Sequence, residues 1–418
     1  MALLCFIAIM LLVRCMDGGD VKGPSPYEQN LPTCGKGFDR VKKKTDAKAM
    51  LCPMIRDEEG FLSEWVGYYQ MHGFDHIMIF NDSSIDNFDE ELKPWIDSGF
   101  VSVRSTWSVE SLNIAPSFLR NAFKKAMTTK AALERECKLQ AIKWGYTLFM
   151  SLDIDEYVIP PAKNHTTIVD WLDDSFKKSQ GRLIHCVNKF NFPSIPHILE
   201  PVHLLTMEAY QTRMMRKGKM NYYTSVMPKC AFHLQGSPLA TNVTSEFIAT
   251  CCHFHGCHGH DFVHMSRFCK ENFHEQHKIL HSGAWITEEM SINHYSRSLE
   301  KYTLKSKTWA TSSGEAMPGQ DSSAAATDYN IDKFFQRSVG WMHDPSALRY
   351  TCQLRELLAK MTGQKVYYRP GFVWYRNPEF GRHVSIPEKR GRYGRPNPEG
   401  FHFKDGNPFH YDGDFDQK

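Results

Sequence analysis

Short apolar segments that each end in charged residues, separated by helical patterns, constrain the fold of this chain more than any other feature. The segments span residues 50–55, 76–80, 100–105 and 146–152. Apolar residues between them recur at helical spacing, and the predicted helices stop at Gly73, Gly99 and Gly145. Strands that alternate with helices favour a parallel sheet with right-handed crossovers. The sequence therefore predicts an α/β fold.

Charged clusters follow three of these segments, at residues 56–59, 81–86 and 153–156. Ligands of open α/β sheets bind outside the carboxyl ends of the strands, so we expect the clusters to line one site. Neither a Gly-x-Gly-x-x-Gly motif nor a P-loop accompanies them, which argues against a dinucleotide-binding or NTPase fold.

The densest cluster lies in the stretch FMSLDIDEYVIP, where Asp153, Asp155 and Glu156 directly follow an apolar run. In an extended segment Asp153 and Asp155 point to the same side, and Ile154 points to the other. Carboxylates at the end of a buried strand are costly unless they are paired. A Mg²⁺ or Mn²⁺ ion offsets that cost and also binds substrate phosphates. The alternative is a surface turn with solvated acids, which the buried run before it disfavours.

The charge balance argues against nucleic acid as a partner. Against 50 Lys and Arg residues the chain carries 47 Asp and Glu residues, so its net charge is only +3. That charge is too small for a long-range field aimed at nucleic acid. The chain also shows no base-reading motif and no basic stripe, and we therefore expect no nucleic-acid partner.

The N-terminus and the cysteine content indicate the secretory pathway. The apolar stretch 2–13 is shorter than the about 20 residues that span a membrane, which favours a signal peptide or a signal-anchor; a short buried helix is the alternative. The chain has 12 cysteines, which suit an oxidising compartment. Sequons at Asn164 and Asn242 agree with it, whereas the sequon at Asn81 is expected to lie in a working site.

Composition predicts how the chain is organised. We expect a signal peptide or anchor at 1–15, a Gly-, Pro- and Lys-rich stem at 16–47, the main α/β domain at 48–310 and an irregular C-terminal extension at 311–418. The Ser- and Ala-rich stretch after Trp309 predicts a loop, and 345–361 predicts a short helix within the extension.

Three segments of the chain, in order and spacing, resemble the nucleotide-sugar transferases of glycosyltransferase family 92 and their family 2-like relatives: RDEEGFLSEWVGYYQMHGFDHIMIFNDSSIDN, LFMSLDIDEYVIP and INHYSRSLEKYTLKSK. The resemblance covers residues 51–307. It implies a GT-A fold with a Rossmann-like, mainly parallel sheet, a UDP-sugar donor, a Mn²⁺ ion and an inverting mechanism. It also implies a type II Golgi membrane protein acting on glycans, with galactose as the favoured sugar and Mg²⁺ as the alternative metal.

The resemblance assigns metal-binding roles residue by residue. Asp153 and Asp155 match the family's Asp-x-Asp motif, with Asp155 as the expected direct ligand. His294, in the triplet NHY, matches a family histidine expected to face the diphosphate and the metal, and a neutral imidazole suits Mn²⁺. The alternative for a lone histidine is a purely structural role.

A larger set of residues is expected to hold the donor. The loop after the second strand would read the nucleoside, although the family order Asp-Asn is reversed here to Asn81-Asp82, which leaves open which residue contacts uracil or ribose. Lys229 and Arg297 are candidates for the phosphate oxygens, with a solvated lysine as the alternative for Lys229. The predicted donor-binding residues are Arg56, Glu58, Asp82, Ser84, Asp86, Asp153, Lys229 and Arg297.

A carboxylate is expected to take the proton from the acceptor hydroxyl, which typically accelerates such a reaction about 10²–10⁴-fold. The candidates are Glu156, Glu246 and Asp261. Ordinary surface acids are the alternative reading for Glu246 and Asp261.

The stretch CCHFHGCHGHDFVHMSRFC, residues 251–269, is a second dense signal and reads as a Cys/His-rich insert. Its cysteines and histidines could build a zinc site, but the spacing fits no standard finger because no Cys-x-x-Cys is present. In an oxidising compartment disulfides are favoured, with Cys257 or Cys269 as a partner. His253 or His255 would alternatively line the acceptor or metal pocket.

Two rival functions compete with a metal-dependent glycosyltransferase. A lumenal glycan-binding or scaffolding protein would keep the fold without turnover, and the joint presence of Asp153, Asp155 and His294 argues against it. A glycosidase needs two separated carboxylates on either side of the glycosidic bond, and no such pair is evident. We expect a UDP-sugar donor, a glycan or glycoprotein acceptor and membrane attachment through the N-terminal segment.

Overall fold

The computed structural model describes part of the chain: residues 34, 40–82, 84, 86–106, 125–161, 166–179, 183–192, 200–201, 204–214, 229–234, 284–298, 301 and 341–363. The apolar N-terminus, the sequons at Asn164 and Asn242, and the Cys/His-rich stretch 251–269 lie outside these residues. None of the helices in the described ranges has the length and hydropathy needed to span a bilayer.

The first half of the central sheet is parallel, as predicted. Its strands are β1 (Ala49–Leu51), β2 (Met54–Ile55), β3 (His76–Asn81), β4 (Val101–Ser105) and β5 (Leu148–Met150). Strand β3 pairs in parallel with β1, β2 and β4, and β1 pairs in parallel with β5. The carboxyl ends of these strands therefore meet at one edge, which is where the charged clusters begin.

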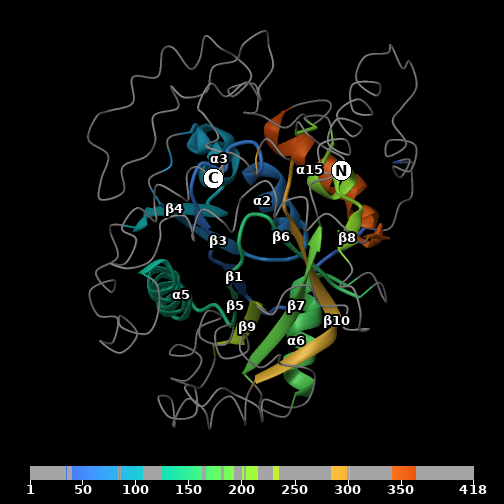
Figure 1. Cartoon of the computed structure of the whole chain (residues 1–418). Coiled ribbons are helices and arrows are strands. Elements are labelled where there is room, and N and C mark those ends of the chain that lie inside the picture. The colour runs from blue at the N-terminus through green and yellow to red at the C-terminus, as the bar shows by residue number, and fades with distance from the viewer. Residues whose placement is uncertain are drawn as a thin grey trace, which may run out of the picture.

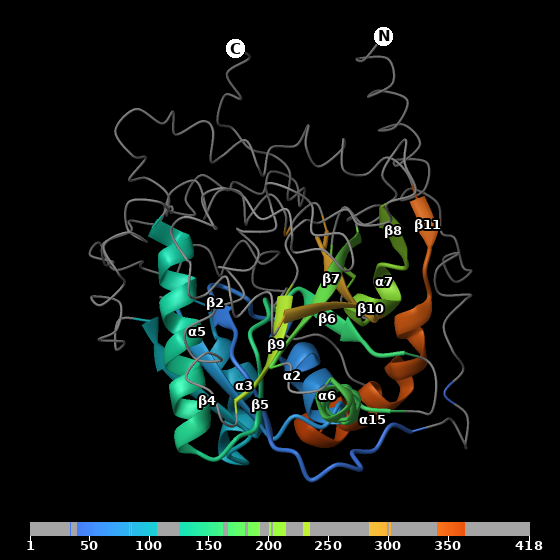
Figure 2. The ribbon, with the colours of Figure 1, turned by 90° about the horizontal axis from the view of Figure 1, so that it is seen from below.

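Helices cover both faces of this half. They are α2 (Leu62–Met71), α3 (Phe88–Asp97) and α5 (Lys125–Lys143). Figures 1 and 2 show α5 on the opposite side of the sheet from α2. Side chains of these strands point to both faces of the sheet. Ile77 and Ile79 belong to the core cluster that includes residues of α2, whereas the ring of Phe149 faces Lys138 of α5. Burial on both faces explains why these strands read as continuous apolar runs.

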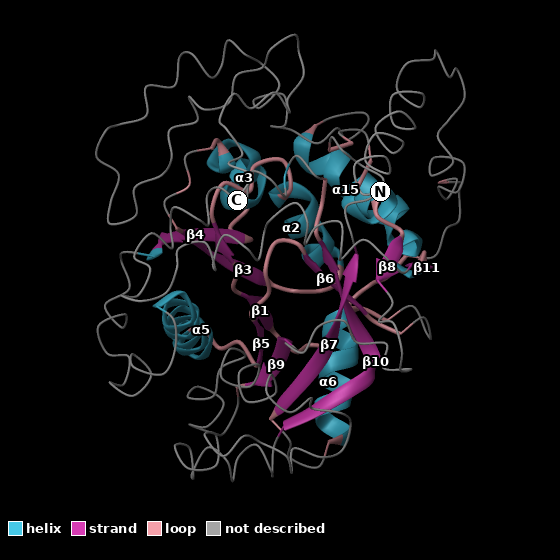
Figure 3. Cartoon of the chain, in the orientation of Figure 1, coloured by secondary structure: helices cyan, strands magenta, loops and turns pink. Residues whose placement is uncertain are grey.

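The second half of the sheet is mixed, and the sequence did not predict its antiparallel pairs. Its strands are β6 (Glu156–Ile159), β7 (Ile184–Phe192), β9 (Lys229–His233) and β10 (Ala284–Tyr295). The order along the sheet is β2-β3-β1-β5-β9-β7-β10-β6, with β4 beside β3 (Figure 3). Strand β9 is antiparallel to β5 and β7, and β10 is parallel to β7 but antiparallel to β6. In this register His294 lies opposite both Glu156 and Asn191.

Helix α2 supports the strand that follows the Asp-x-Asp motif. The indole nitrogen of Trp65 and the hydroxyl of Tyr69 donate to the carbonyl oxygen of Glu156, at 3.0 and 2.9 Å, and the hydroxyl of Tyr68 donates to that of Val158 at 2.7 Å. All three side chains are fully buried. They satisfy carbonyl groups of β6 that would otherwise be buried without partners, which fixes the strand in place.

The described C-terminal residues, 341–363, contribute to this same core, and the predicted division at residue 311 stays a prediction. The C-terminal elements are β11 (Trp341–His343), η7 (Ser346–Tyr350) and α15 (Thr351–Thr362), and the remaining elements earlier in the chain are α6 (Ile168–Lys178), α7 (Thr206–Ala209) and β8 (Thr212–Met214). Strand β11 pairs with β8, and α15 packs on α2 at Gly67, where an added Cβ would lie 3.0 Å from Leu358 Cδ2. The helix predicted at 345–361 is confirmed. It is part of the core because its apolar face, including Leu354, is buried.

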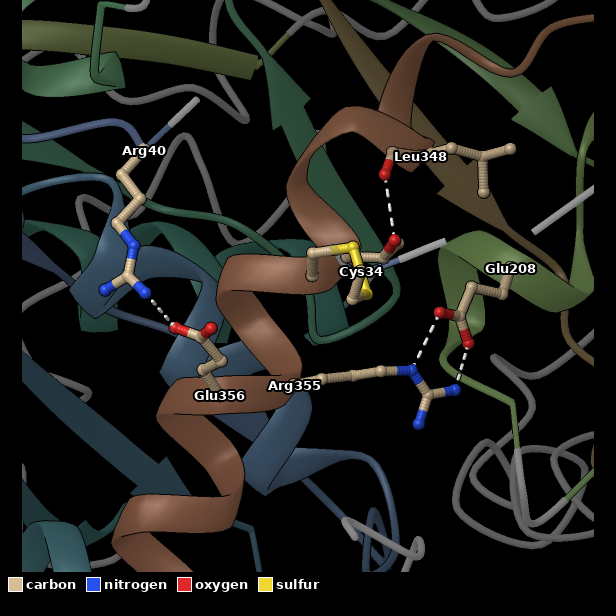
Figure 4. The surroundings of a disulfide bond; sticks show 8 residues. Cys34, Arg40, Glu208, Leu348, Arg355 and Glu356 are labelled. Carbon is tan, nitrogen blue, oxygen red and sulfur yellow. Dashed lines mark hydrogen bonds and ion pairs between the residues drawn. A yellow bond between two sulfur atoms is a disulfide. The ribbon is translucent and has the colours of Figure 1, made fainter. Parts of the chain in front are cut away.

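Cys34, Arg40 and Val41 are tied to α15 by a set of contacts that we call the terminal clasp, part of which Figure 4 shows. Cys34 and Cys352 form a disulfide bond. The side-chain amide of Gln353 both accepts from the backbone nitrogen of Val41 and donates to its oxygen, at 2.8 and 2.9 Å. Arg40 and Glu356 add an exposed ion pair at 2.7 Å. The end of the predicted stem is therefore packed against the core.

Two further disulfides lie within the described residues. Cys52 at the end of β1 pairs with Cys137 of α5, and Cys186 of β7 pairs with Cys230 of β9. The first connects the sheet to a helix on its face, and the second joins neighbouring strands. The predicted pairing of Cys257 or Cys269 falls outside the described residues and stays a prediction.

Candidate active site

The Asp-x-Asp segment lies between β5 and β6, with its apolar residues directed inward. Leu152 and Ile154 are buried. The prediction of an extended segment was wrong, because residues 154 and 155 form a turn in which the backbone nitrogen of Glu156 donates to the carbonyl oxygen of Asp153 at 3.0 Å. Asp155 is also buried, and the side chain of Asp153 is about one-third exposed at 33%. The alternative of a surface turn with solvated acids is therefore excluded. These carboxylates sit in a partly desolvated position where cations must balance them.

Three lysines from different elements converge on Asp153 and Glu156. Lys130 of α5 lies 3.0 Å from one oxygen of Asp153, and Lys229 of β9 lies 3.1 Å from the other. Lys189 of β7 lies 3.0 Å from Glu156, and Lys229 also lies 3.5 Å from it. Burial by itself would raise the pKa of Asp153, but the lysines hold it well below its usual range. Asp153 is therefore ionised and oriented before any ligand arrives.

Glu156 fits a positioning role better than the predicted role of catalytic base. Its side chain exposes none of its surface, and besides its lysine contacts it accepts the backbone N–H of Asp153 at 2.9 Å. A general base must come within hydrogen-bond reach of the acceptor hydroxyl. The other candidates, Glu246 and Asp261, lie outside the described residues and stay predictions.

Asp155 and His294 come together because β10 pairs with β6. The backbone nitrogen of Tyr295 donates to the carbonyl oxygen of Asp155 at 2.9 Å, and His294 Nε2 lies 3.6 Å from Asp155 Oδ1. The other ring nitrogen, Nδ1, lies 2.8 Å from the amide oxygen of Asn191 on β7. An Nδ1–H that donates to this oxygen leaves the lone pair of Nε2 directed toward the carboxylate.

This pair of donors fits a divalent cation. A carboxylate and a neutral imidazole are both ligands of Mn²⁺, and the bond to Asn191 orients the imidazole as such ligands usually are. No group of three or more His, Cys, Asp or Glu side chains gathers in a metal-binding cluster within the described residues. A site with two protein ligands leaves its other positions to substrate phosphates and water, as is usual for Mg²⁺-type sites.

The predicted nucleoside-binding residues hold the loop that follows β2. Arg56 donates from Nε to the carbonyl oxygen of Asp82 at 3.0 Å and forms an ion pair with the Asp82 carboxylate. Ser84 Oγ accepts from the backbone nitrogen of Asp57 at 3.1 Å, and Asp86 accepts from that of Glu59 at 2.7 Å. Burial, together with the nearby carboxylate of Asp57, raises the pKa of Asp86 to about 7. The two charged clusters expected at this edge are thus in contact.

Two more of the predicted donor ligands contact each other. Arg297, directly after β10, lies 2.5 Å from Glu58 in the loop after β2, and both side chains are buried. The segment that follows β10 therefore joins the first charged cluster through an ion pair within the protein. Whether they also touch a donor stays a prediction.

Sequence reasoning missed Lys130, Lys189 and Asn191. Lys130 lies in a helix among other lysines, and no local signal separates it from a solvated residue. Lys189 and Asn191 are alternate residues of β7, in the stretch VNKFNF. Polar residues at every second position of a strand indicate one polar face, and that alternation was the available signal.

Glu91 of α3 anchors the loop after β2, and its titration is expected to change stability with pH. Its carboxylate accepts the backbone N–H groups of Gly60 and Ser63, at 2.6 and 2.7 Å, and burial raises its pKa from 4.5 to about 8. Between these values the folded protein keeps a proton that the unfolded chain has lost. The free energy of unfolding should therefore fall as the pH rises from 5 to 8, by up to about 1.4 kcal/mol per pH unit from this group.

Urea unfolding from pH 5 to pH 8 checks this expectation, with Glu91→Gln as the variant. In the variant, the free energy of unfolding should fall less steeply with pH, because the contribution of Glu91 is gone, whatever the absolute stability of the variant. Glu90→Gln, one position earlier and exposed, is the matched control and should keep the wild-type slope. Identical slopes for wild type and Glu91→Gln would contradict the buried titration.

The model of glycosyltransferase family 92 matches residues 50–332, which is more than half of the chain. The chain belongs to glycosyltransferase family 92. The resemblance in the three segments and the expected enzyme class, a glycosyltransferase, are thereby confirmed. The matched range contains every predicted site residue, and it ends before β11 and α15.

The solved structures to which the chain is similar include two bacterial proteins. Glucosyl-3-phosphoglycerate synthase from Mycobacterium tuberculosis, in complex with Mn²⁺, UDP and glucosyl-3-phosphoglycerate, is 12% identical with a TM-score of 0.30, over 60% of this chain and 71% of that one. S. aureus TarS 1–349 in complex with UDP is 8% identical with a TM-score of 0.32, over 78% of this chain and 99% of that one. No curated protein matches the family 92 chain.

Proposed function

We propose that this family 92 enzyme transfers a sugar, with galactose favoured, from a UDP-sugar to a glycan hydroxyl with inversion, using Mn²⁺ held by Asp155 and His294. The observation that carries the proposal is the pairing of β10 with β6, which sets His294 Nε2 3.6 Å from Asp155 Oδ1 at the carboxyl end of the sheet. A divalent ion there would lie where α/β sheets bind their ligands.

The bound Mn²⁺ would supply Lewis-acid neutralisation of charge on the departing diphosphate. The side chains of the chain itself prepare the surroundings for that anion. Lys130 and Lys229 bring two cations to the carboxylate of Asp153, and such fixed cations favour phosphate oxygens. Asp153 is held by both lysines, so we assign it to orienting them and Asp155 to the metal.

The nucleoside is assigned to the loops after β2 and β3. Asp82 and Asp86 present carboxylates there, and the pKa of Asp86, near 7 because of burial, leaves its side chain able to donate as well as accept near neutral pH. Arg56 holds Asp82 from the neighbouring loop. These groups suit the polar edges of uracil and the hydroxyl groups of ribose.

We also propose a Golgi lumen as the compartment, with attachment by the N-terminal segment as a type II membrane protein, or secretion after its cleavage. The three disulfides among the described residues support an oxidising compartment. Endoglycosidase treatment of protein made in animal cells should lower its apparent mass through Asn164 or Asn242. Fully reduced, unglycosylated protein in the cytosol would refute the assignment.

A donor screen tests the function. The purified protein is incubated with UDP-galactose, UDP-glucose and UDP-N-acetylglucosamine, with Mn²⁺, with Mg²⁺ and with chelator, and UDP release is measured with glycan acceptors present. We expect release with one donor, dependent on the metal. Binding of glycans without turnover of any donor would instead favour the scaffold function.

A further inference from the structure

Two residues with an unusual backbone conformation mark a contact that joins the two halves of the site. Among the described residues, the non-glycine residues with positive φ are Asp57, at 53°, and Arg297, at 62°. L-residues rarely adopt this conformation, and it persists where the surrounding structure enforces it, most often at functional sites. Asp57 precedes Glu58, which contacts Arg297 from 239 positions away.

The contact itself is sealed from solvent. Arg297 Nη1 lies 2.5 Å from Glu58 Oε2, and the guanidinium carbon lies 3.6 Å from the centre of the Phe61 ring. Lys301 donates from Nζ to the carbonyl oxygen of Asp57 at 2.6 Å and lies 3.6 Å from Glu58 Oε2. Arg297 exposes 1% of its surface, Lys301 2% and Glu58 7%. We call the Glu58–Arg297 pair, with Lys301, the latch.

A buried carboxylate accepts hydrogen bonds from each of the two segments that the latch joins. The turn after β10 is held by Glu200, whose carboxylate accepts from the backbone nitrogen of Ser298 at 2.9 Å and from the hydroxyl of Tyr210 at 2.8 Å. The loop after β2 is held by Glu91 at Gly60 and Ser63. The latch therefore connects two segments that other hydrogen bonds already hold in place.

Both segments carry groups of the proposed site. Arg297 follows His294 by three residues, and Glu58 follows Arg56 by two. A displacement at the latch would therefore shift His294 relative to Asp155, and Arg56 relative to Asp82. We propose that the latch positions the metal-binding histidine and the nucleoside-binding loop together, and that Glu58 and Arg297 act through these neighbours without touching the donor. This inference rests on the proposed function, since it assigns the two segments to metal and nucleoside.

Direct contact with the diphosphate is the competing role for Arg297, and binding measurements separate the two. Isothermal titration calorimetry would measure UMP alone and UDP with Mn²⁺ on wild type, Glu58→Gln, Arg297→Gln and the double variant. If the latch positions the site, each single substitution should weaken the binding of both ligands by about tenfold or more. The reason is that loss of a residue supporting a metal site typically lowers the affinity by about 10–100-fold. It also predicts that the double variant binds no more weakly than the weaker single variant, because one break already opens the latch.

The double variant covers the case in which a single variant fails to fold, because it removes both members of the buried Glu58–Arg297 ion pair. Lys301 keeps its hydrogen bond to the carbonyl oxygen of Asp57 in that variant. Arg355→Gln is the matched control. It breaks another Arg–Glu pair, with Glu208, between α15 and α7. Its binding of UMP and of UDP with Mn²⁺ should stay within about twofold of wild type, because these residues lie outside the proposed site.

The outcomes are distinct. If all three latch variants bind UMP and UDP with wild-type affinity, the positioning role of the latch is overturned and the proposed function is not. A loss confined to UDP, with UMP unaffected and additive effects in the double variant, overturns it in favour of direct phosphate contact. A wild-type protein that binds neither UMP nor UDP with Mn²⁺ overturns the proposed function and the latch with it. Coupled losses for both ligands, with Arg355→Gln unchanged, support the latch.

Discussion

Asp155→Ala is expected to lower the rate of sugar transfer by at least about a thousandfold while the protein stays folded. A metal ion that neutralises a departing diphosphate is worth several kcal/mol of barrier, and about 4 kcal/mol corresponds to a factor of about a thousand. Asp155 is the carboxylate that faces His294 Nε2. Its backbone contact with Tyr295 does not depend on the side chain, so β6 and β10 should stay paired.

Transfer rates at increasing Mn²⁺ concentrations, together with thermal unfolding, measure this effect. Asp155→Asn, which keeps the volume of the side chain but not its charge, should also lose most activity. Asp174→Ala is the matched control. Asp174 lies on the surface of α6 in an exposed ion pair with Lys178, and such pairs contribute little. Near wild-type transfer by Asp155→Ala, or full wild-type activity in excess chelator, would refute the metal assignment.

Cys352→Ser is expected to reduce the free energy of unfolding by about 2–5 kcal/mol, the usual cost of removing a native disulfide. The bond joins residues 318 positions apart, so its loss frees a very long loop in the unfolded chain. In the folded protein, the contacts of Gln353 with Val41 and the exposed Arg40–Glu356 ion pair would remain in the terminal clasp.

Denaturant unfolding under non-reducing conditions measures this loss. Cys34→Ser should have the same effect as Cys352→Ser, and the double variant should be no worse than either, because all three remove the same bond. Arg40→Ala removes the neighbouring exposed ion pair and should change stability by less than about 1 kcal/mol. Unchanged unfolding in Cys352→Ser would show that the Cys34–Cys352 disulfide adds nothing to stability.

The parallel half of the fold was predictable because its signals are local. Continuous apolar runs, glycine stops and charges at strand ends lie within short stretches of the chain, and they place β1, β3, β4, β5 and the helices between them. The antiparallel pairs of β9 with its neighbours were not predicted. Strand pairing between distant segments depends on the packing of the whole sheet, and no short-range pattern in 229–233 specifies which strands it joins.

The candidate site divides in the same way. The apolar run and the acids after it predicted a buried Ile154 between two acids, and Ile154 is buried. The extended conformation expected for this stretch was wrong, because residues 154 and 155 form a turn that brings the backbone nitrogen of Glu156 to the carbonyl oxygen of Asp153. The tertiary structure decided what those acids meet: the lysines around Asp153, the imidazole beside Asp155 and the partner of Arg297. These are contacts between groups far apart in the chain, and their strength depends on how completely folding removes water from them. The sequence by itself thus determined which charged groups reach the edge of the sheet, and only folding decided which of them neutralise one another and which stay available to a ligand.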